Sequence, residues 1–237
     1  MRLAAVIFDM DGVLVDSEPT YDRETAAYLR ELGVEPDPDL FDTLRGLPLA
    51  EVWTTIARHH RLPHPVEELA AESVRRLNAY FEQVDRLAPV AGVRKLLRGL
   101  TTDGIRLAVA SSSVASRVQI ILDRLAIARH FDAVVSGDLV GRGKPDPEIF
   151  LTAARRLEVE PSSCVVVEDS ARGVAAALAA GMRCVAYAPD PSHSAGLEGA
   201  DLVVSDFRVI TPERLRDLVA RSRGGAPPAA PSLARKP

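Results

Sequence analysis

The feature that most constrains the fold is an apolar run near the N-terminus that ends in two closely spaced acids. Residues 4–8 are all apolar and include β-branched side chains, which is typical of a strand buried on both faces of a parallel sheet. Asp9 and Asp11 follow directly, and Gly12 allows a tight turn and a close approach to a ligand. Because ligands of open α/β sheets bind at the carboxyl edge, we interpret these acids as part of a site.

A purely structural interpretation of the same residues is also open. An isolated Asp-Gly step is often a turn, closed by a hydrogen bond from a nearby acid. The remaining motifs of the chain therefore have to decide whether Asp9 and Asp11 carry chemistry.

The rest of the chain predicts where further strands and helices lie. From Pro89 onward, helical and strand-like segments alternate, which indicates a parallel sheet covered on both faces. The predicted strands are 105–110, 133–135, 164–167, 183–187 and 202–204, and the predicted helices are 92–100, 115–125, 147–157 and 171–180. From about Asp16 to Arg86, apolar residues recur at helical spacing between prolines, so an all-helical insertion is expected.

These patterns predict an α/β fold, a Rossmann-like doubly wound parallel sheet with a small all-helical cap domain inserted after the first strand. The expected core comprises residues 1–15 and 88–222, and the cap comprises residues 16–87. Such a cap sits over the carboxyl edge of the sheet. Residues 223–237 are rich in Gly, Pro and Ala without an apolar period, so we expect a disordered tail.

Composition excludes several classes of partner. The 237 residues carry 29 basic and 33 acidic side chains, interspersed, so no nucleic-acid partner is expected. No window approaches the roughly 20 apolar residues of a membrane span, and the start of the chain lacks a signal-peptide pattern. Cys164 and Cys184 each open an apolar run and are interpreted as free buried thiols, which fits a reducing cytoplasm. We expect a cytoplasmic monomer without a membrane partner.

A serine cluster follows the predicted strand that ends near residue 110. Ser111 and the backbone N–H groups after it, next to the start of a helix, offer donors for a phosphoryl oxygen. The alternative is helix capping, which serine favours. We expect capping for Ser112 and Ser113, and Ser112 is also a candidate substrate contact.

A lysine and an acid pair complete the set of motifs. Lys144, in the string GRGKPDPEIF, is displayed on a rigid turn and can neutralise a nucleophile and a phosphate as a compact charge. Glu168 and Asp169 follow the apolar string CVVV and are suitable oxygen ligands for Mg²⁺. Asp169 or Ser170 can equally cap the next helix, and both roles are compatible.

In this order, the strings DMDGVLVDSEP, RLAVAS, GKPDP and VVVEDSARG resemble the four signatures of the haloacid dehalogenase superfamily, specifically its β-phosphoglucomutase-like branch of phosphatases and mutases. The resemblance covers roughly residues 1–220. It implies that Asp9 is the nucleophile that accepts a phosphoryl group and that Asp11 is the general acid and base. Ser111 and Lys144 would complete the catalytic set.

The resemblance also implies a magnesium site. Mg²⁺ would be held by the Asp9 carboxylate, the Asp11 main-chain carbonyl and Asp169, with Glu168 as a direct or water-mediated ligand. A physical argument supports this, because several carboxylates repel a phosphate dianion unless a divalent ion and Lys144 offset their charge.

The cap region departs from the mutases of this branch. Those proteins carry a histidine shortly after the first motif, where this chain has Glu18-Pro19-Thr20-Tyr21. After Arg45-Gly46, Leu49 stands at the apparent place of an arginine that grips a second phosphate, and Val114 stands where mutases often have a lysine. Two lost cations weaken any site for a bisphosphate. We therefore expect a Mg²⁺-dependent phosphatase of a small sugar phosphate or sugar-acid phosphate, with a hexose phosphate mutase as the alternative.

The expected substrate contacts beside Ser112 are Gly12, Glu18 and Arg45. Tyr21 and Trp53 are weaker candidates, since both are more simply explained as core or hinge aromatics. Dehalogenation is disfavoured because it has no use for a metal-binding acid pair. A catalytically silent phosphate-binding module is disfavoured because Asp9, Asp11, Lys144 and Asp169 are all present.

Overall fold

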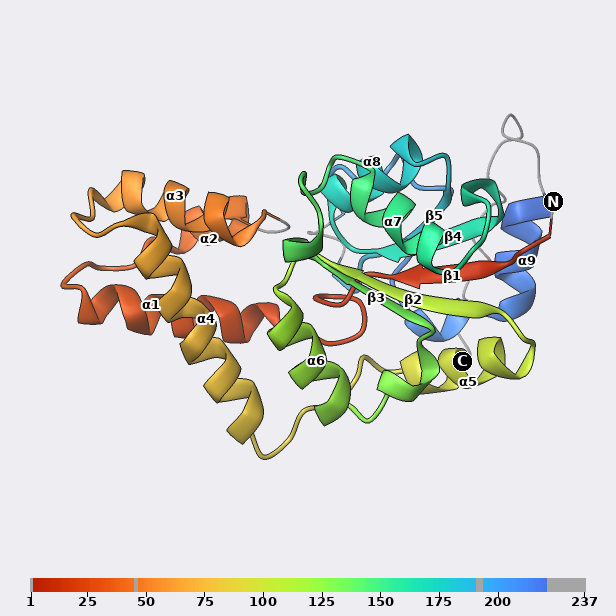
Figure 1. Cartoon of the computed structure of the whole chain (residues 1–237), viewed down its shortest axis with the longest axis horizontal. Helices are drawn as coiled ribbons and strands as arrows, with labels where there is room; N and C mark the ends of the chain where they lie inside the picture. The colour runs from red at the N-terminus through yellow and green to blue at the C-terminus, as the bar shows by residue number, and fades with distance from the viewer. Residues whose placement is uncertain (1, 45–46, 191–193, 221–237) are drawn as a thin grey trace, which may run out of the picture.

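The computed structural model describes residues 2–44, 47–190 and 194–220, and within these residues six parallel strands form one sheet (Figure 1). In sheet order the strands are β3 (Ala133–Ser136), β2 (Arg106–Ser111), β1 (Ala5–Phe8), β4 (Cys164–Glu168), β5 (Arg183–Tyr187) and β6 (Leu202–Val204). The direction of winding reverses between β1 and β4. Such a switch point is where open α/β sheets bind their ligands.

The register of the sheet brings three motifs to one edge. Phe8, the last residue of β1, pairs with Val109 on β2 and with Val167 on β4. Asp9 therefore leaves β1 at the edge where Ser111 ends β2 and Glu168 ends β4. The convergence of motifs far apart in the sequence follows directly from parallel pairing.

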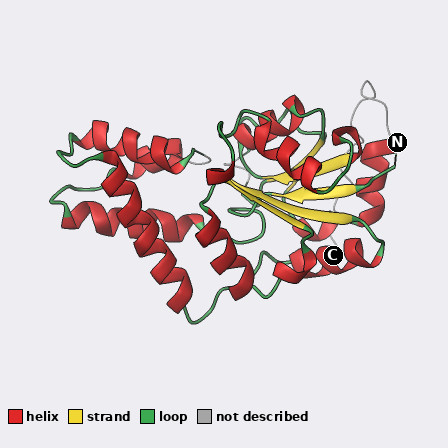
Figure 2. Ribbon diagram, in the orientation of Figure 1, coloured by secondary structure: helices red, strands yellow, loops and turns green. Residues whose placement is uncertain are grey.

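Helices cover both faces of this sheet (Figure 2). One face packs against α5 (Val93–Thr102), α6 (Ala115–Arg124) and α9 (Pro212–Ala220), and the other against α7 (Glu148–Arg156) and α8 (Ala171–Ala179). Along β1, Val6 and Phe8 belong to the first apolar core, while Ala5 and Ile7 belong to the second. Burial on both faces explains why this strand is apolar at every position.

The region between β1 and α5 is helical. Its helices are α1 (Glu18–Glu31), α2 (Pro38–Leu44), α3 (Leu49–His60) and α4 (Val66–Gln83). They lie beyond the carboxyl ends of the strands (Figure 1) and share a separate apolar core that includes Tyr28, Leu29 and Trp53. This arrangement confirms the predicted fold class, whereas the boundaries of residues 16–87 stay a prediction.

Helix α4 joins the helical region to the sheet domain. Leu77 and Phe81 on α4 belong to the same apolar core as Val118 on α6, and the two helices lie side by side (Figure 1). The Asn78 side-chain amide donates a hydrogen bond to Ser116 Oγ across this contact, at 2.9 Å. This contact places α6 directly beside the helical region.

The structure agrees with the predicted strands and helices to within about two residues at each end, a normal difference for helix and strand boundaries. It adds helix α9, which the sequence analysis does not predict. Pro212 at its start and buried Leu215, Leu218 and Val219 at helical spacing are the signals for it. Cys164 and Cys184 are free and buried, as predicted.

Two sequence predictions fall outside the described residues. They are the contact assigned to Arg45 and the disorder of residues 223–237. Within the residues that the structure describes, no helix combines the length and apolar character needed to span a membrane.

Candidate active site

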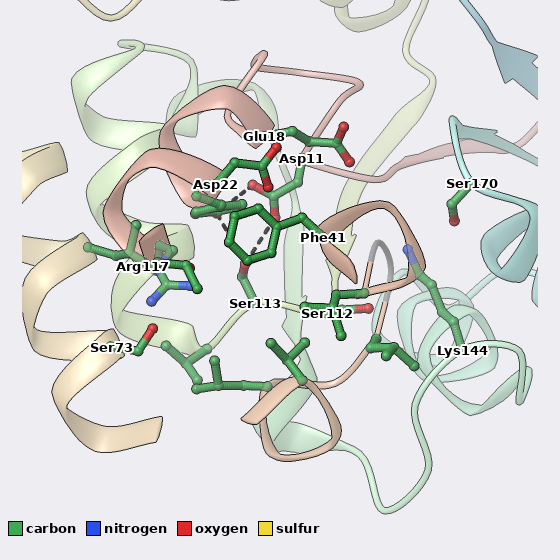
Figure 3. A pocket seen from close by; sticks show the side chains of 18 of the residues that line it. Asp11, Glu18, Asp22, Phe41, Ser73, Ser112, Ser113, Arg117, Lys144 and Ser170 are labelled. Atoms are coloured by element: carbon green, nitrogen blue, oxygen red, sulfur yellow. Dashed lines mark hydrogen bonds between the residues drawn. The ribbon is translucent and has the colours of Figure 1, made fainter. Parts of the chain in front are cut away.

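A pocket lies at the carboxyl edge of the sheet, between the sheet domain and the helices α1–α4 (Figure 3). The sheet domain contributes its polar motif residues, and the helical region contributes mainly apolar and aromatic side chains. Its lining includes Asp9, Asp11, Ser112, Ser113, Val114, Arg117, Lys144, Glu168 and Asp169 from the former, and Glu18, Tyr21, Phe41, Leu49, Trp53, Ser73 and Leu77 from the latter.

Lys144 connects the first and fourth motifs. Its Nζ donates hydrogen bonds to Asp9 Oδ1 and to Glu168 Oε1, each at 2.5 Å, and all three side chains are buried. Burial lowers the pKa of Lys144, but the neighbouring Asp9 and Glu168 carboxylates outweigh it and raise the pKa above its ordinary value. Lys144 is therefore a fixed positive charge.

One lysine does not balance the acids around it. Burial raises the pKa of Asp9 to about 8, because the attraction of Lys144 is opposed by repulsion from Glu168 and Asp11. Burial, Glu168 and Asp9 likewise raise the pKa of Asp169 well above its ordinary value. When these acids are all ionised, their negative charge exceeds the single positive charge of Lys144, and only protons or a bound cation can relieve the repulsion.

Glu168 is held by donors on both of its oxygens. Oε1 accepts from Lys144, while Oε2 accepts from the backbone N–H groups of Asp169 and Ser170, each at 2.8 Å, and from Ser170 Oγ at 3.0 Å. Ser170 also caps α8, since its Oγ accepts from the Gly173 backbone N–H. The prediction that Ser170 caps the helix after Glu168 is confirmed. The same segment fixes the position of the Glu168 carboxylate.

Asp11 is surrounded by hydroxyl groups. Ser17 Oγ and the Tyr21 hydroxyl each donate to Asp11 Oδ1 at 2.6 Å. Ser113 Oγ donates to Oδ2 at 2.9 Å (Figure 3). Ser111 Oγ lies farther from Oδ2, at 3.4 Å. Donors from the start of α1 and from the loop before α6 therefore hold the carboxylate together.

Three oxygen groups near this edge lack protein donors. Among the described residues, no hydrogen bond reaches Asp9 Oδ2, the Asp11 main-chain carbonyl or the Asp169 carboxylate. Gly12, with φ of +76°, leaves room for Asp169, because a Cβ on Gly12 would lie 1.8 Å from Asp169 Oδ2. Two carboxylates, a carbonyl and an uncompensated negative charge fit a hard divalent cation such as Mg²⁺.

The four predicted metal-binding residues do not form a ready cluster of side chains. Within the described part of the chain, no three His, Cys, Asp or Glu side chains are grouped as ligands. The reasons are visible in the contacts, since Asp11 turns its carboxylate toward hydroxyls and Glu168 is occupied by Lys144 and backbone donors.

The structure corrects one prediction about the serine cluster. Ser112 and Ser113 do not cap α6, whose N-cap is Val114 without a side-chain hydrogen bond. Asp138 Oδ1 instead accepts from the Ala115 backbone N–H at 3.1 Å, which frees Ser113 to bind Asp11. Ser112 lines the pocket, and Ser111 is buried beneath it.

The other predicted contacts fall into three groups. Glu18 lines the pocket, and Leu49 and Val114, interpreted as replacements for cations, line it as well. Trp53 also reaches the pocket but packs mainly in the helical core, with its ring centroid 5.4 Å from that of Tyr28. Arg45 lies outside the described residues.

Two pocket residues make contacts that the sequence does not predict. Tyr21 packs against Phe81 as expected of a hinge aromatic, but its hydroxyl also holds Asp11. Arg117 is only 4% exposed, lines the pocket and was not singled out at all. Its signal is a cation on the otherwise apolar face of α6, one helical turn after Val114.

Comparisons with known proteins agree with these motifs. Residues 6–187 match the family described as haloacid dehalogenase-like hydrolase. A phosphorylated carbohydrates phosphatase from Thermotoga maritima is 36% identical over 180 residues, covering 76% of this chain and 82% of that protein. A β-phosphoglucomutase from Bacillus subtilis is 32% identical over 230 residues, covering 91% and 95% of the two chains.

A larger relative and a solved structure extend the comparison. The bifunctional riboflavin kinase/FMN phosphatase of Arabidopsis thaliana is 31% identical over 217 residues, and the match covers 89% of this chain but only 55% of that protein. The chain thus spans about half the length of this relative. The crystal structure of CbbY from Rhodobacter sphaeroides in complex with phosphate superposes with a TM-score of 0.81 at 27% identity, covering 91% of this chain and all of the other.

The family match spans most of the chain, and its four motifs meet at one edge of the sheet. Relatives at 30% identity or more align along most of the sequence. The chain belongs to the haloacid dehalogenase-like hydrolases.

Proposed function

We propose that the chain is a Mg²⁺-dependent phosphatase that hydrolyses a small sugar phosphate or sugar-acid phosphate through an aspartyl-phosphate intermediate on Asp9. The observation that carries this proposal is the bridge of Lys144 between Asp9 and Glu168 at the base of the pocket. In this bridge the buried Asp9 carboxylate, the proposed nucleophile, lies next to a fixed cation at the switch point of the sheet. Phosphoryl transfer depends mostly on such positioning and charge stabilisation.

The geometry of Asp9 suits a nucleophile. Lys144 holds Oδ1, so Oδ2 is the oxygen left to attack phosphorus. The attack forms a bond from Oδ2 to phosphorus and breaks the bond from phosphorus to the leaving oxygen, giving an acyl phosphate. Water then cleaves the acyl phosphate and restores the carboxylate. Ser111, which the sequence analysis places in the catalytic set, is buried and accepts a hydrogen bond from the Ser113 backbone N–H. Ser112, which lines the pocket, is therefore the proposed donor to the phosphoryl oxygens.

Asp11 is the proposed proton donor to the leaving oxygen and proton acceptor from the attacking water. Its carboxylate is held by Ser17, Tyr21 and Ser113, so one of these hydroxyls has to give way to the substrate oxygen. The availability of Asp11 for proton transfer therefore depends on the contact between α1 and the loop before α6.

Mg²⁺ is proposed to bind the Asp9 carboxylate, the Asp11 main-chain carbonyl and Asp169. When bound, the ion draws charge from the phosphoryl oxygens and offsets the repulsion between substrate and acids. Because both of its carboxylate oxygens already accept hydrogen bonds, Glu168 is assigned to positioning Lys144 and Asp169 rather than to direct ligation.

Hydrolysis is favoured over isomerisation by the distal part of the pocket. A mutase has to hold a bisphosphate by its second phosphate while the first reacts. Leu49 and Val114 supply no charge there, and Arg117 is the one cation besides Lys144 among the described lining residues. The phosphatase from T. maritima supports this choice, while the mutase from B. subtilis and Arg117 keep a hexose phosphate mutase as the second candidate.

The replacement Asp9→Asn should abolish turnover while leaving the fold intact, because the amide keeps the shape but cannot act as the carboxylate nucleophile. Phosphate release should fall by about 10⁴-fold or more, as when other enzymes lose a nucleophile. Circular dichroism and thermal melting check the fold, and Asp103→Asn, at an exposed acid outside the pocket, serves as the control. Retained turnover in a verified, uncontaminated preparation would remove Asp9 from this role.

Removal of divalent metal should stop phosphate release, because the acids would then repel the substrate. The enzyme is treated with a chelator, and metal content is verified before assay. Activity should return on addition of Mg²⁺. Full turnover in the metal-free enzyme contradicts the proposed cofactor.

The replacement Gly12→Ala tests whether the position of the Asp169 carboxylate matters for Mg²⁺ binding, with Gly33→Ala as the matched control. Both glycines have a left-handed φ, +76° and +78°, so each substitution should lower the free energy of unfolding by about 1–2 kcal/mol. Only the Gly12 variant brings a Cβ against Asp169, since Gly33 has no neighbour within 4 Å. It alone should raise the Mg²⁺ concentration for half-maximal activity, by about 10- to 100-fold. An unchanged Mg²⁺ requirement in Gly12→Ala refutes the role given to Asp169.

The choice between hydrolase and mutase is tested by product analysis. β-Glucose 1-phosphate is supplied with Mg²⁺ and a bisphosphate activator, and free phosphate and glucose 6-phosphate are both followed. We expect net phosphate release. Rapid formation of glucose 6-phosphate with negligible free phosphate establishes the mutase instead.

A further inference from the structure

Arg117 is a buried cation without hydrogen-bond partners on part of its guanidinium. It lies in the first half of α6 and is 4% exposed, yet it lines the pocket. Its Nε and Nη2 atoms are buried, and no partner for either is found among the described residues. Buried polar groups in folded proteins nearly always have partners, so these two donors require an explanation.

The observed neighbours do not satisfy these donors. The guanidinium carbon lies 5.3 Å from the centroid of the Tyr21 ring, a cation–π contact that leaves the in-plane N–H groups unused. Ser73 on α4 lies near Arg117 (Figure 3), and Leu77 on α4 and Val114, the N-cap of α6, also line the pocket. The Arg117 side chain is thus held by burial and by the Tyr21 ring, while its Nε and Nη2 donors remain available to a ligand.

Tyr21 also lies between Arg117 and Asp11, the proposed acid–base residue. Its hydroxyl binds Asp11 at 2.6 Å while its ring contacts Arg117, so one phenol ring separates the proposed acid–base residue from the guanidinium. Asp9, Lys144 and Arg117 line the same pocket, so a substrate whose phosphate lies at Asp9 and Lys144 can direct its other end toward Arg117.

Resting on the phosphatase function proposed above, we propose that Arg117 is a specificity-determining residue that binds an anionic group at the end of the substrate opposite the scissile phosphate. The group is a carboxylate or a second phosphate, whose oxygens match the planar fork of a guanidinium. A neutral hydroxyl would accept one hydrogen bond but leave the buried charge uncompensated. The enzyme should accordingly prefer doubly anionic substrates.

The test measures kcat/KM for matched pairs of substrates. One set pairs phosphorylated sugar acids with the corresponding phosphorylated sugar alcohols, from triose to hexose length, so that only a carboxylate is exchanged for a hydroxymethyl group. The other set pairs sugar bisphosphates with the monophosphates. Preference within the first set identifies a carboxylate as the distal group, and preference within the second identifies a phosphate.

Each pair is measured with the wild type and with Arg117→Met, Arg117→Lys and Arg129→Met. Methionine retains the apolar stem that contacts Tyr21, lysine restores the charge without the fork, and Arg129 is an exposed arginine outside the pocket. Circular dichroism and melting confirm the fold of each variant. If Arg117→Met is unstable, Arg117→Lys gives the comparison.

We expect the wild type to favour the doubly anionic member of a pair, and Arg117→Met to reduce that preference by about 10- to 100-fold, mainly through KM. Arg117→Lys should restore part of the preference, and Arg129→Met should keep it whole. Equal losses on both members of every pair, or no preference in the wild type, overturn the proposal. Failure of the wild type to hydrolyse any compound in either set refutes the proposed phosphatase function instead.

Discussion

The site depends on the burial of Lys144 between two acids. A buried lysine requires paired, hydrogen-bonded partners, and Asp9 and Glu168 supply them from the ends of adjacent strands. The start of α8 in turn fixes Glu168 through two backbone N–H groups. Gly173 makes this possible, because a Cβ at that position would lie 1.8 Å from the Glu168 carboxylate. The burial of Lys144 therefore also requires a glycine at position 173 in α8, the helix that follows Glu168.

A second constraint links the helical region to the sheet domain through Asp11. Ser17 and Tyr21 bind this carboxylate from the segment that begins α1, and Ser113 binds it from the loop before α6. The position of Asp11, the proposed acid–base residue, is therefore set by both regions together. A shift of the helical region relative to the sheet domain therefore changes the hydrogen bonds of Asp11. The hydrogen bond between Lys144 and Asp9 lies within the sheet domain and does not depend on that shift.

Most of the fold and the polar base of the site follow from local sequence. The strand pattern predicts parallel pairing, and parallel pairing alone brings Asp9, Ser111 and Glu168 to one edge. The rest is set by tertiary contacts that spacing does not encode. Serine is a favoured N-cap residue, so the sequence suggests that Ser113 caps α6. In the structure Asp138 accepts the hydrogen bond from the first N–H group of α6, and Ser113 donates to Asp11 instead. Arg117 resembles an ordinary helix cation until α4 and Tyr21 cover it.

The same tertiary contacts change the interpretation of the distal pocket. Leu49 and Val114 suggest by sequence that the end of the pocket opposite the phosphate site has lost its cations, and both side chains do line it. Arg117 supplies a charge there from the next turn of α6, on the face that α4 and α1 cover. Because α6 begins directly after the serine loop that binds Asp11, this helix and the loop before it place both Arg117 and a hydrogen-bond donor to Asp11. The Tyr21 ring lies between Asp11 and Arg117, so under the proposed role of Arg117 the packing of α1 against α6 determines which substrate lengths fit.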